Sequence, residues 1–371
     1  MKQFFAATVN RSDLTKALGH IQRIIEKRNT MAILANVLIE ASGDEIAFRG
    51  TDLDIEATES VPAAISQPGA ITVPAHLLYD IARKLPEGAQ ISLTIDGPDD
   101  PLIIRTGRSR FSLRTLPVTD YPALDAGDFP TRFTTGAASF KGLIDNCAFA
   151  ISTEETRYYL NGIFLHTLDG DTLRAVATDG HRLARLEMKA PQGSNGEPGV
   201  ILPRKVVGEV MKLLDEADDV TVSLSKAKVR FEIGKVVLTS KLIDGNFPDY
   251  ARVIPTGNDK TVEVEKALIE AAVGRVATVS PEKSNAIKLS VDAGRVTLSV
   301  NNPDSGSASE EIDAAYEGSP FEIGFNAKYL LDTLAHCEGD RVTMRFSDAG
   351  SPTIFEGQSA VALYVLMPLR V

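Results

Sequence analysis

A strand–helix–strand unit that occurs three times constrains the fold of this chain more than any other feature. Each copy has a short apolar strand, a Pro or Asn, and a helix with apolar residues at helical spacing. The copies read AITVPAHLLYDIARKL, GVILPRKVVGEVMKLL and FEIGFNAKYLLDTLAHC. Apolar residues at i, i+3/i+4 and i+7/i+8 are typical of an amphipathic helix. The chain therefore contains an internal repeat, and its fold must be built from the repeated unit.

The distance in sequence between equivalent positions supports the repeat. The predicted apolar helix faces are Leu77, Leu78, Ile81 and Leu85, then Val206, Val207, Val210 and Leu214, then Tyr329, Leu330, Leu334 and Cys337. The first residues of the three sets, at 77, 206 and 329, are 129 and 123 residues apart. The alternating strands that follow begin at 91, 220 and 342, which are 129 and 122 residues apart. Agreement between two elements over three copies favours one domain type repeated.

Each copy also begins with an earlier helix, followed by a strand pair that closes in a polar turn. The turns read RGTDLD at 49–54, VATDGH at 176–181 and SVNNPD at 299–304. Two helices on one face of antiparallel strands make an α+β unit. The predicted helices span 11–28, 75–84, 139–150, 204–214, 265–275 and 327–337. We expect three domains, at 1–127, 128–254 and 255–371; three unrelated α+β domains remain an alternative.

Composition excludes several classes of protein. The 371 residues are 43% hydrophobic and 24% charged, which is ordinary for a globular protein, and the net charge of −11 excludes a uniformly basic coat. No apolar run approaches the ~18 residues that span a bilayer, and the N-terminus does not resemble a signal peptide. Cys147 and Cys337 form no CxxC pair, so we expect no zinc ribbon and no disulfide framework. These features predict a cytoplasmic protein.

The charges are distributed unevenly between helices and the rest of the chain. The six predicted helices hold 14 Lys and Arg against 8 Asp and Glu, a net of +6, which leaves a net of −17 elsewhere. Helices that cover the sheets with their apolar sides would turn positive sides toward a common space. Such a field attracts a polyanion to one face and repels it elsewhere. A solvated helix face without any ligand is the alternative.

Several segments together resemble a known family, the bacterial replicative sliding clamp, which is the β subunit of DNA polymerase III. The segments are GTDLDIE at 50–56, GRSRFSLRTLP at 107–117, TRYYLNGIF at 156–164, ATDGHRLA at 177–184, TSKLIDGNFPDYARVIP at 239–255 and YVLMPLRV at 364–371. The resemblance implies three tandem copies of the DNA-clamp domain per chain. It further implies a head-to-tail homodimer that forms a six-domain ring around duplex DNA.

A clamp must slide, so its contacts with DNA should be weak, sequence-independent and made to phosphates. Flexible basic side chains on the lining helices suit this role, and the candidates are Arg23, Lys27, Arg28, Arg83, Lys84, Arg204, Lys205 and Lys212. The resemblance also implies that Arg28, Tyr158 and Tyr159 contact template DNA near one face of the ring. Simple packing at the rim is the alternative for the two tyrosines.

The resemblance implies a hydrophobic pocket between the second and third domains, where a short peptide from polymerases or repair proteins binds. The matching positions are Arg157, Leu160, Thr178, Gly180, His181, Arg182, Leu183, Pro248, Arg252, Val253, Val365, Met367, Pro368, Leu369 and Arg370. An adaptable apolar surface that contains Met and Pro suits one site with many partners. The alternative is that these residues only seal the junction between domains.

Ring closure requires an open strand edge at each end of the chain. The alternating segment 108–114 is the first edge, and by resemblance it joins the third domain of a second copy; the predicted interface is Arg108, Arg110, Phe111, Leu113, Thr278 and Val279. Pairing by sheet extension satisfies the backbone groups at both edges. The expected partners are therefore a second copy of the chain, double-stranded DNA, a clamp loader, and the polymerase III α subunit with other polymerases and repair proteins.

Catalytic motifs are missing from the sequence. The pair Asp179 and His181 has no accompanying nucleophile elbow, and no Walker A or G-x-G-x-x-G sequence occurs. None of the five histidines has the spacing of a zinc site. We therefore expect a non-catalytic protein without a metal or cofactor. A repeat-built protein-interaction module that does not encircle DNA is the alternative to a clamp.

Overall fold

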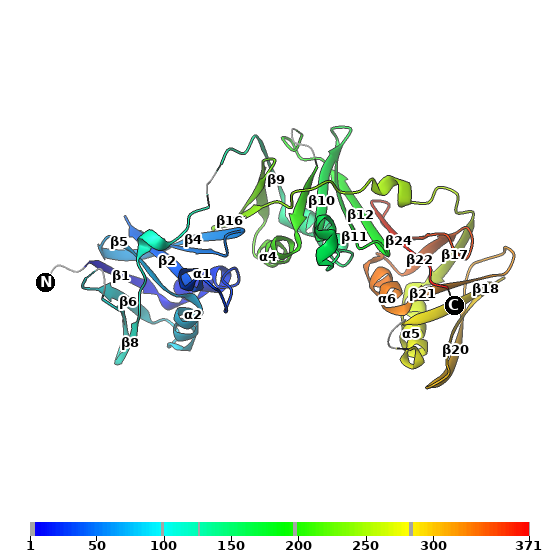
Figure 1. Cartoon of the computed structure of the whole chain (residues 1–371), viewed down its shortest axis with the longest axis horizontal. Helices are drawn as coiled ribbons and strands as arrows, with labels where there is room; N and C mark the ends of the chain where they lie inside the picture. Colours follow the sequence, from blue (N-terminus) through cyan, green and yellow to red (C-terminus); the bar gives the residue numbers. More distant parts are fainter. Residues whose placement is uncertain (1–3, 98–99, 125–126, 196–198, 282–284, 371) are drawn as a thin grey trace. The chain divides into compact units, whose positions relative to one another are not determined.

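The computed structural model of the chain describes residues 4–97, 100–124, 127–195, 199–281 and 285–370 (Figure 1). The α-helices within these ranges are α1 (Arg11–Ile21), α2 (Ala75–Lys84), α3 (Ala137–Ala148), α4 (Arg204–Leu214), α5 (Lys266–Val276) and α6 (Ala327–His336). The chain divides into two compact units, Met1–Ala138 with Gly208–Leu242, and Ser139–Val207 with Ile243–Val371. The divisions fall inside α3 and α4.

The described strands of the first unit form one twelve-stranded antiparallel sheet. They are β1 (Phe5–Asn10), β2 (Asn36–Ser42), β3 (Glu45–Thr51), β4 (Ile55–Gln67), β5 (Gly69–Pro74), β6 (Gln90–Ile95), β7 (Leu102–Thr106), β8 (Ser109–Leu113), β9 (Thr131–Gly136), β14 (Asp219–Leu224), β15 (Lys228–Ile233) and β16 (Val236–Lys241). Their main order is β8-β7-β6-β1-β4-β16-β15-β14-β9, with β3, β2 and β5 following from β4. The pairing of β4 with β16 joins strands from the first and second predicted domains.

The described strands of the second unit form two sheets. They are β10 (Gly162–Leu168), β11 (Thr172–Thr178), β12 (Arg182–Lys189), β13 (Val200–Pro203), β17 (Lys260–Glu265), β18 (Ala286–Asp292), β19 (Arg295–Asn302), β20 (Gly306–Asp313), β21 (Phe321–Asn326), β22 (Arg341–Phe346), β23 (Thr353–Glu356) and β24 (Ala362–Leu366). The eight-stranded sheet has the order β13-β10-β11-β12-β24-β23-β22-β17, and the four-stranded sheet has β20-β19-β18-β21.

Helices pack in pairs against these sheets. In the first unit α1 contacts α2 and strands β3 and β4, and in the second unit α5 contacts α6 and strands β19 and β20 (Figure 1). The approach of α1 to its sheet depends on Gly50, because a Cβ atom there would lie 2.6 Å from the Ile21 side chain. Buried aliphatic residues from helix and sheet form the cores on which each unit depends.

The repeat predicted from the sequence is confirmed. The three copies are β5-α2-β6, β13-α4-β14 and β21-α6-β22. Two of the three polar turns are also built alike: Thr51 Oγ1 donates to the Ile55 carbonyl over 2.8 Å, and Thr178 Oγ1 donates to the Arg182 carbonyl over 2.7 Å. One residue in each of these turns has a positive φ, 81° at Leu53 and 88° at Gly180.

Two details of the predicted helices are wrong. The first helix ends at Ile21 rather than at residue 28. After it, the chain turns so that the side chains of Ile24 and Ile25 are buried in the core. The Ile25 carbonyl accepts a hydrogen bond from the His76 ring over 2.9 Å. Arg23, Lys27 and Arg28 therefore follow the helix instead of lying on it. Leu77 is 48% exposed, although Leu78, Ile81 and Leu85 on the same predicted face are buried.

Candidate binding surfaces

The turn between β11 and β12 presents the first part of the predicted peptide pocket. The Asp179 carboxylate accepts hydrogen bonds from the backbone N–H groups of His181 and Arg182 over 2.9 and 3.0 Å. Strand β12 pairs with the C-terminal strand β24, and the Met367 N–H donates to the His181 carbonyl over 2.8 Å. Residues almost two hundred positions apart in sequence are thereby fixed side by side.

An apolar cluster lies beneath this turn. Val176, Leu183 and Val365 are buried and in contact, and Phe247, Tyr250 and Ile254 of the segment after β16 pack against them together with Phe164 and Leu363. Large apolar side chains remain at the surface close by in the sequence, with Val253 50% exposed and Met367 39% exposed. A buried apolar base with exposed apolar groups above it suits the docking of an apolar side chain.

Arg182 is held by four groups from both predicted domains of this unit. Its guanidinium lies 3.1 Å from the Asp179 carboxylate and 2.6 Å from the Asp332 carboxylate. The same group lies over the rings of Tyr329 and Phe149, at 4.5 and 5.2 Å from their centroids. The sequence did not assign Asp332, Tyr329 or Phe149 to the pocket, because only the folded chain brings them to Arg182.

Gly180 and Arg157 form the rim of the turn. The φ of 88° at Gly180 favours glycine, and a Cβ atom there would lie 2.6 Å from the Arg157 guanidinium. Arg157 donates to the Asp179 carbonyl over 3.0 Å and pairs with Glu154 over 2.8 Å. Gly180 therefore allows the arginine to close over the backbone of the turn.

The structure places the remaining predicted pocket residues as follows. Leu160 is buried at the end of the 3-10 helix Glu155–Leu160, and the Leu369 N–H donates to the Gly324 carbonyl over 2.8 Å. Arg252 extends into solvent and pairs with Asp249 over 2.8 Å. Arg370 lines a cavity of about 730 Å³ over strands β18 to β20, with Lys288 and Glu322. Pro248 is exposed and Pro368 is half-buried.

The predicted DNA-contacting residues are mostly exposed. Arg23, Lys27, Arg28, Arg83, Lys84, Tyr158, Arg204 and Lys212 are exposed, and Tyr159 and Lys205 are half-buried. Arg83 pairs with Asp80 over 2.9 Å, and Lys212 pairs with Glu209 over 2.7 Å. The rings of Tyr158 and Tyr159 meet edge to face with centroids 5.8 Å apart. The helices as observed carry 11 Lys and Arg against 6 Asp and Glu, a net of +5, so the predicted positive sign persists.

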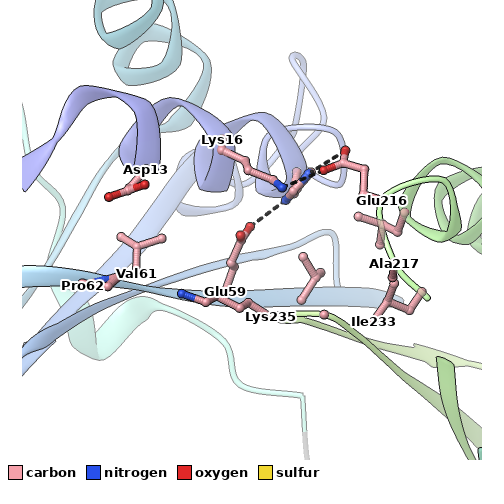
Figure 2. Close-up of a pocket in the computed structure, with 13 residues that line it drawn as sticks. Asp13, Lys16, Glu59, Val61, Pro62, Glu216, Ala217, Ile233 and Lys235 are labelled. Carbon is pink, nitrogen blue, oxygen red and sulfur yellow. Dashed lines mark hydrogen bonds and ion pairs between the residues drawn. The ribbon is translucent and has the colours of Figure 1, made fainter. Parts of the chain in front are cut away.

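Figure 2 shows a cluster of charged side chains next to α1 that was not predicted from the sequence. His20 on α1 points at Glu59 on β4 and at Glu216 after α4, and Lys16 pairs with Glu216 over 2.9 Å. These residues line a cavity of about 310 Å³ together with Asp13 and other side chains. The alternation of β4 could have revealed Glu59, because it shares the inward face of that strand with Ala57 and Val61.

The predicted dimer residues lie at two sheet edges. Strand β8 is the last strand of the first unit's sheet, and along it Arg110 is exposed, Phe111 is half-buried and Leu113 is buried. Strand β20 is the last strand of the four-stranded sheet. Thr278 and Val279 lie in the 3-10 helix Ala277–Val279, which contacts β20. Arg108 is exposed in the turn before β8.

Two absences concern only the described residues. No helix in them is long and apolar enough to cross a membrane. In that part of the chain no group of three or more His, Cys, Asp or Glu side chains could hold a metal ion.

The repeated α+β domain, the positive helices and the open sheet edges together define a class of protein, the DNA sliding clamps. Three family models match in order along the chain: the N-terminal domain of the DNA polymerase III beta subunit at residues 5–125, its central domain at 135–249, and its C-terminal domain at 251–370. The chain belongs to the DNA polymerase III beta subunit family. This confirms the resemblance and the prediction of three tandem clamp domains.

Proteins that are similar to this chain in sequence and structure are also named sliding clamps. The chain is 51% identical to the beta sliding clamp of Caulobacter vibrioides strain NA1000 over 98% of its length and 99% of that protein, and 40% identical to the clamp of Escherichia coli K12 over the same shares. It matches the crystal structure of the Bartonella birtlesii sliding clamp bound to griselimycin with a TM-score of 0.96 and 50% identity, covering 99% of this chain and 100% of that one. The chain thus functions as a DNA sliding clamp and is a non-catalytic replication subunit.

Proposed function

We propose that two copies of this chain pair head to tail into a ring of six domains that encloses duplex DNA and tethers other proteins to it. The observation that carries this proposal is the presence of two different open sheet edges, β8 and β20, in a chain of three tandem clamp domains. Pairing of one edge with the other is a heterologous contact, which gives a ring when the rotation closes. The proposed interface residues are Arg108, Arg110, Phe111, Leu113, Thr278 and Val279.

The DNA enclosed by the ring would be held by weak contacts. The net charge of +5 on the observed helices, within a chain of net charge −11, supports a positive lining. Exposed, flexible lysine and arginine side chains exchange phosphate partners readily, so the ring can move along the duplex. Tyr158 and Tyr159 are proposed to contact template DNA together with Arg28.

The apolar surface around His181 and Met367 is proposed to bind a short linear peptide of the partner protein. The buried cluster of Val176, Leu183 and Val365, with exposed apolar side chains near it, supports this role. A few anchor side chains of the peptide would contribute most of the affinity. The proposed partners are the polymerase III α subunit, other polymerases, repair proteins and a clamp loader, all in the cytoplasm.

The domain limits proposed for this assembly are residues 1–127, 128–254 and 255–371. The ranges of the family models support the first limit, which falls in the gap at 126–134, and the second limit lies four residues after the gap at residue 250. Each limit lies within a connection between strands rather than inside a helix or strand.

Sedimentation of the purified chain tests the ring. A closed dimer has twice the 39.9 kDa mass of one chain and should be found at low micromolar concentration, with a frictional ratio above that of a compact sphere. A single species of 39.9 kDa under the same conditions would refute the proposed assembly.

A further inference from the structure

Residues 247–254 form one side of the proposed peptide pocket and contain three of its predicted residues. Pro248, Arg252 and Val253 are exposed in this segment, and only Phe247, Tyr250 and Ile254 among its described residues are half-buried. The position of the exposed pocket residues therefore depends on how these three side chains are anchored.

The first anchor is a stack of rings. The rings of Phe247 and Phe164 are parallel within 5°, with centroids 5.0 Å apart. Phe164 stacks in turn on the imidazole of His166, at 4.7 Å between centroids. The segment thus rests on strand β10 through stacked aromatic contacts.

The second anchor is directional and passes through the Tyr250 hydroxyl. Arg174 donates to this oxygen over 2.8 Å, and His166 Nε2 lies 2.9 Å from it. His166 and Arg174 are register partners on β10 and β11, so both present their side chains on the same face of the sheet. One hydroxyl therefore joins the segment to two neighbouring strands.

The chemistry of the guanidinium fixes the direction of the first of these hydrogen bonds. A guanidinium can only donate, so the Tyr250 oxygen accepts from Arg174, and the hydroxyl proton remains available for His166. When the imidazole is neutral with its proton on Nδ1, His166 Nε2 accepts that proton. A protonated imidazole would leave the hydroxyl proton without this acceptor.

The charges around His166 favour the neutral form. Arg174 on β11 lies beside it, and Glu187 on β12 pairs with Arg174 over 2.6 Å while Arg185 lies 3.5 Å from the same carboxylate. On the other side, β13 is preceded by Gly199, which carries no charge. Burial, and then the Arg174 guanidinium, lower the pKa of His166 below its ordinary value, and a hydrogen bond with the Thr167 backbone and the charge of Glu187 only partly offset this.

We propose that Tyr250 is a positioning residue of the peptide pocket, which holds residues 247–254 in place through Arg174 and neutral His166, and that protonation of His166 releases this segment. This inference rests on the proposed function of the pocket as a peptide site. It adds an acid-sensitive element, because the pocket keeps its shape at neutral pH and loses one wall in acid.

Binding of a fluorescein-labelled peptide from the polymerase III α subunit to the full chain, followed by anisotropy at pH 7.5, tests the hydroxyl. Tyr250→Phe should weaken binding by roughly 10- to 100-fold, the effect of the two hydrogen bonds that the hydroxyl makes. Tyr316→Phe is the matched control, since its hydroxyl donates to the Ser319 carbonyl instead, and it should leave affinity unchanged. Equal affinity of Tyr250→Phe and the parent would overturn the positioning role, and no binding by the parent would overturn the pocket itself.

The pH profile separates this role from a general effect on folding. The parent should bind more weakly at pH 5.5 than at pH 7.5. His166→Gln, whose amide oxygen can accept from Tyr250 at any pH, should bind like the parent at pH 7.5 and lose the part of the decline that His166 causes. His181 is present in both proteins, so its contribution cancels in the comparison. An identical decline in His166→Gln and the parent would contradict the proposal.

Discussion

The Nδ1 atom of His20 lies 2.7 Å from a carboxylate oxygen of Glu59, and both side chains are buried. Nε2 of the same ring lies 3.3 Å from Glu216 (Figure 2). Burial lowers the pKa of His20, but hydrogen bonds and charge attraction from Glu59 and Glu216 outweigh it, so this pKa is raised above its ordinary value. The ring thus bridges two carboxylates on elements far apart in sequence.

Replacement of His20 by Gln should destabilise the first unit by about 3 kcal/mol in acid, because it leaves the buried Glu59 without its cationic partner. A raised native pKa means that the stabilisation is fully present below the unfolded value of about 6.5 and is lost as pH rises through the native pKa. The loss of stability should therefore be larger at pH 6 than at pH 9. Urea unfolding at the two pH values measures it, and a larger loss at pH 9 would contradict the charged bridge.

Leu53 has a φ of 81° in a turn where its counterpart is Gly180. Left-handed backbone costs a leucine roughly 1–2 kcal/mol, whereas asparagine tolerates this conformation. Leu53→Asn should therefore raise the free energy of unfolding by about 0.5–1 kcal/mol. Leu77→Asn is the control, because Leu77 is also exposed but lies in a helix, where asparagine is disfavoured. Thermal denaturation should move in opposite directions for the two variants, and a common direction would argue against backbone strain at Leu53.

Phe111 lies half-buried on the edge strand β8. Phe111→Ala should weaken dimerisation about 100-fold or more, because a central aromatic residue of an interface contributes about 3 kcal/mol. Leu77→Ala removes an exposed apolar side chain on α2, away from this edge, and serves as the control. Sedimentation at decreasing concentration compares the variants, and an unaltered profile for Phe111→Ala would count against the proposed interface.

Removal of residues 367–371 should abolish peptide binding at the pocket. The tail is fixed by the Met367 N–H on the His181 carbonyl and by the Leu369 N–H on the Gly324 carbonyl, so its loss exposes the turn to solvent. Residue 371 lies outside the described residues. Anisotropy with the polymerase-derived peptide measures the loss, and Arg252→Ala provides a comparison in which an exposed side chain of the same surface is removed. Unchanged affinity of the truncated chain would refute the recruitment site.

The sequence predicted most of the fold because the repeat and the apolar periodicity are local signals. Helices α2, α4 and α6 and the strands that follow them lie where the spacing placed them. The end of α1 could not be predicted, because it depends on a hydrogen bond between the His76 ring and the Ile25 carbonyl. These two residues are 51 positions apart in the sequence. The exposure of Leu77 likewise depends on which neighbouring elements cover α2.

The candidate sites were predicted less completely, because long-range contacts determine them. The motif match identified His181 and Arg182, but Asp332, which lies 2.6 Å from Arg182, comes from α6, 150 residues away, where the repeat marks only apolar positions. Tyr250 and its partners His166 and Arg174 meet only through sheet register and the path of a loop. Glu59 was also missed, although a charged residue on the apolar face of β4 is visible in the alternation.

Retention on DNA tests the enclosing ring most directly. The chain is loaded onto a nicked circular plasmid by a clamp loader, washed at high salt, and then the plasmid is cut to linear form. A ring is held by topology rather than by phosphate contacts, so it should remain on the circle at high salt and slide off the cut DNA. Equal retention on circular and linear DNA, or release from the circle by salt alone, would contradict enclosure.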